Sequence, residues 1–187
     1  MKRLTKLSVL LLWMLAFILP ASSVVLAEEV TCHGSMGAVT VDNLRVPQNA
    51  NCKLNGTKVQ GTIKVETGAS LTASKISVIG NIQAEGAKSV TVTNSIVGGS
   101  IQVNQGGGAK IDKVTVKGDI QFDANKRALS ATNNKVGGSV QAFQNTGGVT
   151  ISYNTIDGNL QCKENRPAPI GKKNVVHGNK EDQCAGL

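Results

Sequence analysis

Acidic side chains are the obvious candidates for chemistry here, because paired carboxylates can transfer protons or hold a hard cation. Their positions can be compared within a sequence repeat that runs through most of the chain. Asp119 shares its repeat position with Ser100 and Ser139, and not with a second carboxylate. Three other aspartates fall at different repeat positions: Asp112, Asp123 and Asp157. We therefore expect that no two acids stack on adjacent rungs, and we expect no catalytic residues and no metal or cofactor.

Four cysteines and two histidines are the other reactive side chains. His33 and His177 lie near opposite ends of the chain, and no nucleophile elbow, phosphate-binding loop or HExxH motif is present. Zinc is a competing use of the cysteines, but the chain has no C-x-x-C pair. An even cysteine count favours two disulfides in an oxidising compartment, formed among Cys32, Cys52, Cys162 and Cys184.

The segment 1–27 has the layout of a secretory signal peptide. Lys2, Arg3 and Lys6 precede an apolar run that ends in small residues, and cleavage is expected after Ala27. A membrane anchor is the alternative, but the apolar run is short for a span. Export would end in the periplasm, at the cell surface or outside the cell, and no later segment is long and apolar enough to span a bilayer.

Removal of the leader would lower the net charge from +8 to +5. A basic chain can bind nucleic acid, anionic membranes or acidic glycans. The remaining aromatic residues are too few to form a base-stacking platform, so we do not expect nucleic-acid binding: Phe122, Phe143 and Tyr153.

A repeated tetrapeptide is the strongest feature of the sequence. It begins with glycine and reads GTIK, GNIQ, GSIQ, GDIQ, GSVQ and GNLQ at positions 61, 80, 99, 118, 138 and 158, and Gly178 continues the glycine series. Apolar residues alternate with polar ones on both sides of each glycine, which is the period of a β-strand. A second alternating stretch follows in each repeat, and Asn and Gly residues between the stretches are typical of turns.

One such repeat cannot bury its apolar residues alone, but stacked repeats can. The sequence therefore predicts an all-β, single-stranded parallel β-helix of about seven coils, each of about 19–20 residues, capped at both ends, with right-handed winding favoured. An antiparallel sandwich does not require a fixed repeat, and a leucine-rich repeat requires a Leu and Asn framework that is absent. The predicted boundaries are a signal peptide at 1–27, an N-terminal cap at 28–41, the β-helix at 42–177 and a C-terminal cap at 178–187.

Coil geometry selects the disulfide pairing. Cys52 lies in the first predicted coil and Cys162 in the seventh, about 28 Å away at a strand spacing of about 4.8 Å. A disulfide needs Cα atoms within about 7 Å of each other. The sequence therefore predicts Cys32–Cys52 at the front and Cys162–Cys184 at the back.

Two polar ladders are expected on the outside of the rod. One is a glutamine ladder whose amides can hydrogen-bond along the rod axis, and for which we favour a structural role over a binding role. Its members are Gln83, Gln102, Gln121, Gln141 and Gln161. The other is a candidate binding face of hydroxyls, similar to the ice-binding faces of β-helical antifreeze proteins but interrupted by Lys110 and Asp112. Its members are Thr72, Ser74, Thr91, Thr93, Ser130, Thr132, Thr150 and Ser152.

The V-x-G-[NSD]-I-Q repeats over residues 42–178 resemble those of uncharacterised bacterial exported β-helix repeat proteins. They are similar, more loosely, to the polymer-forming bactofilin repeats, whose coils stack end to end into filaments. The chain departs from bactofilins in its signal peptide, its cysteines and its two caps.

These features lead us to expect a secreted, non-catalytic structural or interaction module of the bacterial envelope or exterior. Envelope polysaccharide and self-association are the partners considered. The alternative is a protein that binds a repetitive ligand, polysaccharide or ice, through the Thr/Ser face. A degenerate polysaccharide-processing enzyme is a third option, and it requires the separated acids to converge.

Overall fold

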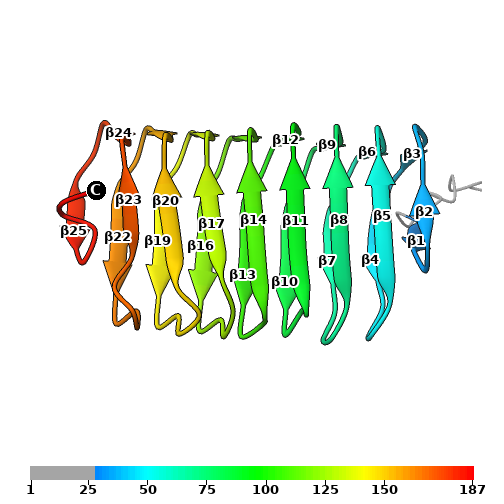
Figure 1. The fold of residues 1–187 in the computed structure, drawn as a ribbon. Coiled ribbons are helices and arrows are strands. Elements are labelled where there is room, and N and C mark those ends of the chain that lie inside the picture. The colour runs from blue at the N-terminus through cyan, green and yellow to red at the C-terminus, as the bar shows by residue number, and fades with distance from the viewer. Residues whose placement is uncertain (1–27) are drawn as a thin grey trace, which may run out of the picture.

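The fold is a parallel β-helix, described for residues 28–187 in a computed structural model (Figure 1). The predicted signal peptide lies outside these residues. Each coil of the chain contributes strands to three sheets, and every strand pairs in parallel with the equivalent strand one coil away. The coils follow one another along the axis from the blue N-terminal end to the red C-terminal end of Figure 1.

We name the three sheets A, B and C. Sheet A has nine strands: β1 (Glu29–Thr31), β4 (Asn43–Val46), β7 (Ile63–Val65), β10 (Ile82–Glu85), β13 (Ile101–Asn104), β16 (Ile120–Asp123), β19 (Val140–Phe143), β22 (Leu160–Lys163) and β25 (Lys180–Asp182).

Sheet B has eight strands, of which β5, β8, β11 and β14 are the longest of their coils. They are β2 (Ser35–Met36), β5 (Asn51–Asn55), β8 (Ser70–Ser74), β11 (Ser89–Thr93), β14 (Gly108–Asp112), β17 (Leu129–Thr132), β20 (Val149–Ser152) and β23 (Ile170–Lys172).

Sheet C has eight very short strands. They are β3 (Thr40–Val41), β6 (Lys58–Val59), β9 (Ser77–Val78), β12 (Ile96–Val97), β15 (Thr115–Val116), β18 (Lys135–Val136), β21 (Thr155–Ile156) and β24 (Val175–Val176).

The predicted all-β parallel β-helix is confirmed, with one more coil than expected. Residues 28–41, expected to break the repeat as a cap, supply β1, β2 and β3 and so add one strand to each sheet. The structure therefore has about eight coils where the sequence predicted about seven. The added coil lacks the V-x-G-[NSD]-I-Q motif, which is why the repeat pattern missed it.

The core consists of apolar columns that run along the rod axis. Alternate residues of each strand point inward, so equivalent side chains of successive coils lie in contact, as Ile82 does with Ile101 and Ile101 with Ile120. Each of these three isoleucines is fully buried. Phe122 is the largest core residue, and it is flanked in its column by the smaller Val103 and Ala142. This alternation of size lets a ring fit without opening a gap.

The coil becomes longer by a single residue at one bend. Phe122 of sheet A pairs with Val103, whereas Leu129 of sheet B pairs with Ala109, and the second pair is more widely separated in sequence than the first. The extra residue therefore enters between sheets A and B, in the bend that contains Asn125. The later coils keep this longer bend, since Val149 pairs with Leu129.

The glycine at the start of each tetrapeptide is required by close approach of backbones. A Cβ on Gly118 would lie 3.0 Å from backbone atoms of Gly99, and one on Gly158 would lie 2.8 Å from those of Gly138. Neither glycine has a positive φ. The left-handed bend positions are instead held mostly by other residues, including Lys75, Asn94, Lys113, Asn133 and Tyr153.

The two ends are closed by the predicted pair of disulfides. Cys32–Cys52 joins the first two coils with a Cα–Cα distance of 5.6 Å, and Cys162–Cys184 joins the C-terminal tail to β22 with a Cα–Cα distance of 5.2 Å. All four cysteines are buried. Residues 28–187 contribute no helix capable of crossing a bilayer.

Candidate functional site

The repeated motif is used to build the rod. In V-x-G-[NSD]-I-Q, the Val and Ile fill the core and the glycine admits the neighbouring backbone. The [NSD] side chain accepts a hydrogen bond from the backbone N–H one coil later: Ser100 N–H donates to Asn81 Oδ1 at 2.8 Å, and Asp119 N–H donates to Ser100 Oγ at 3.0 Å. Asp119 thus has hydroxyl neighbours, as the sequence predicted, and its Oδ1 accepts from Ser139 N–H at 2.6 Å.

Two asparagine ladders lie inside the rod, and sequence reasoning missed them. Asn134 and Asn154 lie at bends between strands, where Asn residues were predicted to form turns, and both are buried. Asn134 Nδ2 donates to Asn154 Oδ1 at 3.0 Å and to the carbonyl of Ile111 at 3.0 Å. The ladders satisfy backbone groups at the bends of the later coils, and their members are Asn125, Asn145 and Asn165 at one bend and Asn134, Asn154 and Asn174 at the other. The regular recurrence of Asn at these two repeat positions was the signal available in the sequence.

The glutamine ladder forms along the outside of sheet A. Gln83 Nε2 donates to Gln102 Oε1 at 3.3 Å, and the chain of bonds continues through Gln121 and Gln141 to Gln161. Gln161 Nε2 then donates to Glu181 Oε2 at 2.7 Å. Each amide is therefore engaged with its neighbours along the axis, as expected of a structural ladder.

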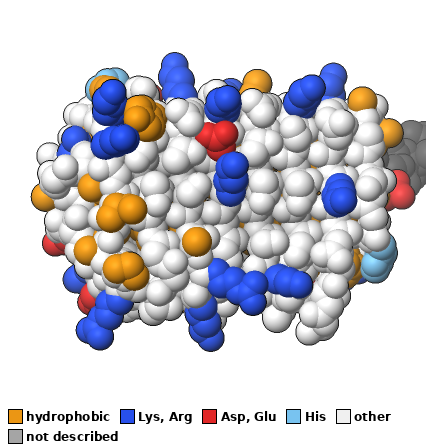
Figure 2. Space-filling model, in the orientation of Figure 1, with side chains coloured by type: hydrophobic (Ala, Val, Ile, Leu, Met, Phe, Trp, Pro, Cys, Tyr) orange, Lys and Arg blue, Asp and Glu red, His pale blue; other side chains and the backbone are white. Residues whose placement is uncertain are grey.

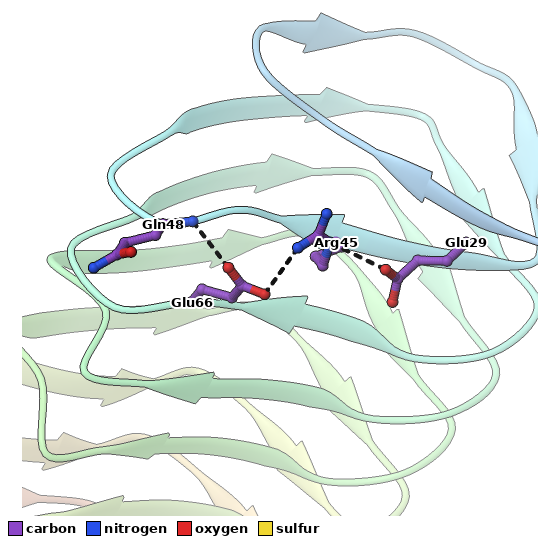
Figure 3. Close-up of polar contacts among 4 residues, drawn as sticks. All are labelled: Glu29, Arg45, Gln48 and Glu66. Carbon is purple, nitrogen blue, oxygen red and sulfur yellow. Dashed lines mark hydrogen bonds and ion pairs between the residues drawn. The ribbon is translucent and has the colours of Figure 1, made fainter.

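An acidic and basic cluster adjoins this ladder at the N-terminal end (Figure 3). Arg45 lies between two carboxylates, with Nε 3.0 Å from Glu29 Oε1 and Nη1 3.2 Å from Glu66 Oε1. The Nε contact is an ion pair without the alignment of a hydrogen bond. Gln48 N–H also donates to Glu66 Oε2 at 3.0 Å. The cluster thus holds β1, β4 and β7 together.

Glu66 and Glu85 lie on adjacent rungs, so the expectation that no two acids would do so is wrong. They directly follow Val65 and Ala84, which pair in sheet A. Both line a polar groove of about 520 Å³ with Lys64 and Asn104. A hydrogen bond from Arg45 lowers the pKa of Glu66, and the Gln48 N–H acts in the same direction against partial desolvation. Glu66 is thus held ionised by structural partners.

The Thr/Ser side chains do form ladders on sheet B. Thr72 pairs with Thr91, Ser74 with Thr93, Ser130 with Thr150, and Thr132 with Ser152. Of the eight side chains, Ser152 is buried, and its Oγ accepts from Lys172 N–H, while the others are at least partly exposed.

The register also places charged and apolar residues in the hydroxyl columns. Lys53 pairs with Thr72, Lys110 with Thr91 and Ser130, and Ile170 with Thr150. Ile170 is 66% exposed. The sheet B face is therefore an interrupted hydroxyl array with lysines inside it.

Asp112 is the acid within this array, and its carboxylate accepts hydrogen bonds from neighbouring side chains. Thr132 Oγ1 and Asn133 Nδ2 each donate to its Oδ1 at 2.8 Å. These hydrogen bonds, that of Asn133 first, lower the pKa of Asp112. It therefore acts as an acceptor that joins β14 to the following coil.

The two histidines stay apart, at the first and last coils. His177 Nδ1 lies 3.0 Å from Asp157 Oδ1 on the exposed surface. Among residues 28–187, no three or more His, Cys, Asp or Glu side chains are grouped so that they could hold a metal ion. No known protein family, curated protein or solved structure matches this chain.

Proposed function

We propose that this protein is a secreted, non-catalytic interaction module of a bacterial envelope or exterior, with sheet B as its contact surface. One observation carries the proposal. The outward glutamines of sheet A bond to one another along the rod, and each strand of sheet C has only two residues. Sheet B instead presents a broad array in which outward Thr, Ser and Lys side chains stack in register from coil to coil and, apart from Ser152, are at least partly exposed.

A rigid scaffold supports such a role. The side chains of sheet B repeat at the strand spacing of about 4.8 Å, so a ligand with its own linear repeat can contact several coils at once. Two disulfides are consistent with an oxidising location outside the cytoplasm.

The second candidate function is binding of a repetitive ligand, polysaccharide or ice, through the Thr/Ser face. The in-register hydroxyl columns of Thr72 with Thr91 and Ser130 with Thr150 favour it. Between the two ligands, polysaccharide is favoured, because Lys53, Lys110 and Asp112 interrupt the flat, weakly charged plane that an ice lattice requires.

The test is retention of the purified protein on a panel of insoluble glycans and on ice. A Thr91→Glu and Thr150→Glu double variant is expected to lose retention at least tenfold. The matched control is Thr115→Glu with Thr155→Glu, because these threonines project from sheet C and receive the same charges. Equal retention of both variants would refute sheet B as the contact surface. Measurable turnover of any glycan by the wild-type protein would contradict the non-catalytic assignment.

A further inference from the structure

Charge is distributed unequally around the rod. We define the B side as the outward strands of sheet B with the bend residues that flank them, namely residues 51–56, 70–75, 88–94, 107–113, 126–133, 146–153 and 166–173. Asp112 is the one acidic residue in these ranges. Ten basic residues share them: Lys53, Lys75, Lys88, Lys110, Lys113, Lys126, Arg127, Arg166, Lys172 and Lys173.

The rest of the described chain has the opposite balance. It contains the other eleven acids and seven basic residues, so the B side has a net charge of +9 and the remainder −4. Figure 2 views the B side and shows blue basic side chains within the face and along both of its rims. The net charge alone does not reveal this separation.

The positive charges lie in rows that follow the rod axis. Lys53 and Lys110 belong to one hydroxyl column and are three rungs apart, or about 14 Å, with Thr72 and Thr91 between them. The left-handed bend positions after sheet B form another row that contains Lys75, Lys113 and Lys173. A linear partner lying along this hydroxyl column would therefore meet the ammonium groups of Lys53 and Lys110 with two hydroxyls between them.

We propose that the B side binds a linear acidic polysaccharide whose carboxylates pair with its lysines and arginines and whose hydroxyls bond to its threonines and serines. This inference deepens the proposed function and rests on sheet B being the contact surface. Nucleic acid fits less well, because Tyr153 is the one aromatic residue on the B side and the ammonium groups of Lys172 and Lys173 already lie 5.9 and 5.7 Å from its ring. A membrane surface fits less well too, because the exposed large apolar side chains of the B side, Tyr153 and Ile170, are confined to the last two coils of sheet B, whereas the basic residues extend along the whole side.

Each exposed lysine–carboxylate pair is weak, so affinity must come from many pairs and must fall with salt. Polygalacturonate is a suitable probe because it carries one carboxylate on every sugar. We expect calorimetry to detect its binding to the purified protein at low ionic strength, with at least a tenfold weaker affinity at about 0.3 M salt. Binding that does not change with salt would overturn the proposal.

The decisive comparison uses two variants with the same change in charge. Lys53→Gln, Lys110→Gln and Lys113→Gln together remove three charges from the B side, and binding is expected to weaken at least tenfold. Lys58→Gln, Lys117→Gln and Lys135→Gln remove three charges from sheet C and its edge, and binding is expected to weaken less than twofold. All six lysines are exposed, and circular dichroism would verify that both variants fold. Equal weakening would overturn the proposal.

Ligand controls separate this inference from the proposed function. Carboxyl-reduced polygalacturonate should bind at least tenfold more weakly than the acidic form. If neutral glycans are retained through Thr91 and Thr150 while polygalacturonate is not, the contact surface stands and the acidic ligand is wrong. If single-stranded DNA or anionic phosphatidylserine vesicles bind more tightly than polygalacturonate, the polysaccharide assignment is likewise wrong.

Discussion

Two kinds of amide ladder run along this rod, and at the scale of single residues they differ in whether water can replace a lost partner. Asn145 is buried; its Nδ2 donates to the Phe122 carbonyl and to Asn165 Oδ1, and its Oδ1 accepts from Asn125. Gln141 makes similar bonds to Gln121 and Gln161 at the surface. A buried polar group without a partner bears its full desolvation cost, whereas an exposed one bonds to water.

Asn145→Ala is therefore expected to lower the free energy of unfolding by about 2–4 kcal/mol, because it leaves several buried groups unpaired. Gln141→Ala, the matched surface variant, is expected to lower it by less than about 1 kcal/mol. Urea unfolding followed by circular dichroism measures both. If the two variants lose similar stability, then burial does not distinguish the ladders.

Asp112 makes stability depend on pH in a defined direction. Its pKa is lowered in the folded protein, so its contribution is complete above its ordinary pKa of 3.8 and is lost as pH falls through the lower folded-state value. The stability difference between wild type and Asp112→Asn should shrink as the solution is acidified below about pH 4. Asn133→Gly removes one donor to Asp112 and should reduce this pH dependence. A difference that stays constant down to about pH 2 would contradict this account.

At the scale of elements, the close approach of backbones at the bends limits which residues can be substituted there. A Cβ on Gly118 would lie 3.0 Å from backbone atoms of Gly99, a bend residue whose backbone is hydrogen-bonded to Gly80 and Gly118 in the adjacent coils and cannot move alone. Gly118→Ala is expected to cost about 1–3 kcal/mol, the usual range for forcing atoms into a packed site. Gly34→Ala is the control, since a Cβ there has no neighbour within 4 Å. Thermal unfolding of the two variants would test this, and equal melting temperatures would contradict it.

At the scale of the whole molecule, each coil contacts its two neighbours, so stability should be local along the axis. Removing Cys162–Cys184 by alanine substitution of both residues is expected to cost about 3 kcal/mol for a closed loop of this length. Hydrogen exchange should then accelerate in β22–β25 and remain unchanged in β1–β5. Replacing Cys32 and Cys52 should give the reverse pattern. Acceleration throughout the rod after either change would show that the coils unfold as one unit.

Much of the fold could be predicted because parallel stacking repeats every environment. A side chain that faces inward in one coil faces inward in all, so the Val and Ile ranks, the outward Gln ladder and the distance between Cys52 and Cys162 follow from the period alone. The first coil escaped prediction because residues 28–41 pair with their neighbours through backbone groups without sharing the motif.

The sequence by itself determined the period, the inward ranks and the disulfide pairing, because each depends on position within a repeat. The tertiary structure decided what happens at the bends. It turned Asn134 inward while the preceding Asn133 took the left-handed conformation. It also gathered the lysines of strands and bends on one side of the rod. The physical reason is that the backbone angles at a bend set the direction of each side chain there. The alternation of apolar and polar residues along the strands does not specify those angles.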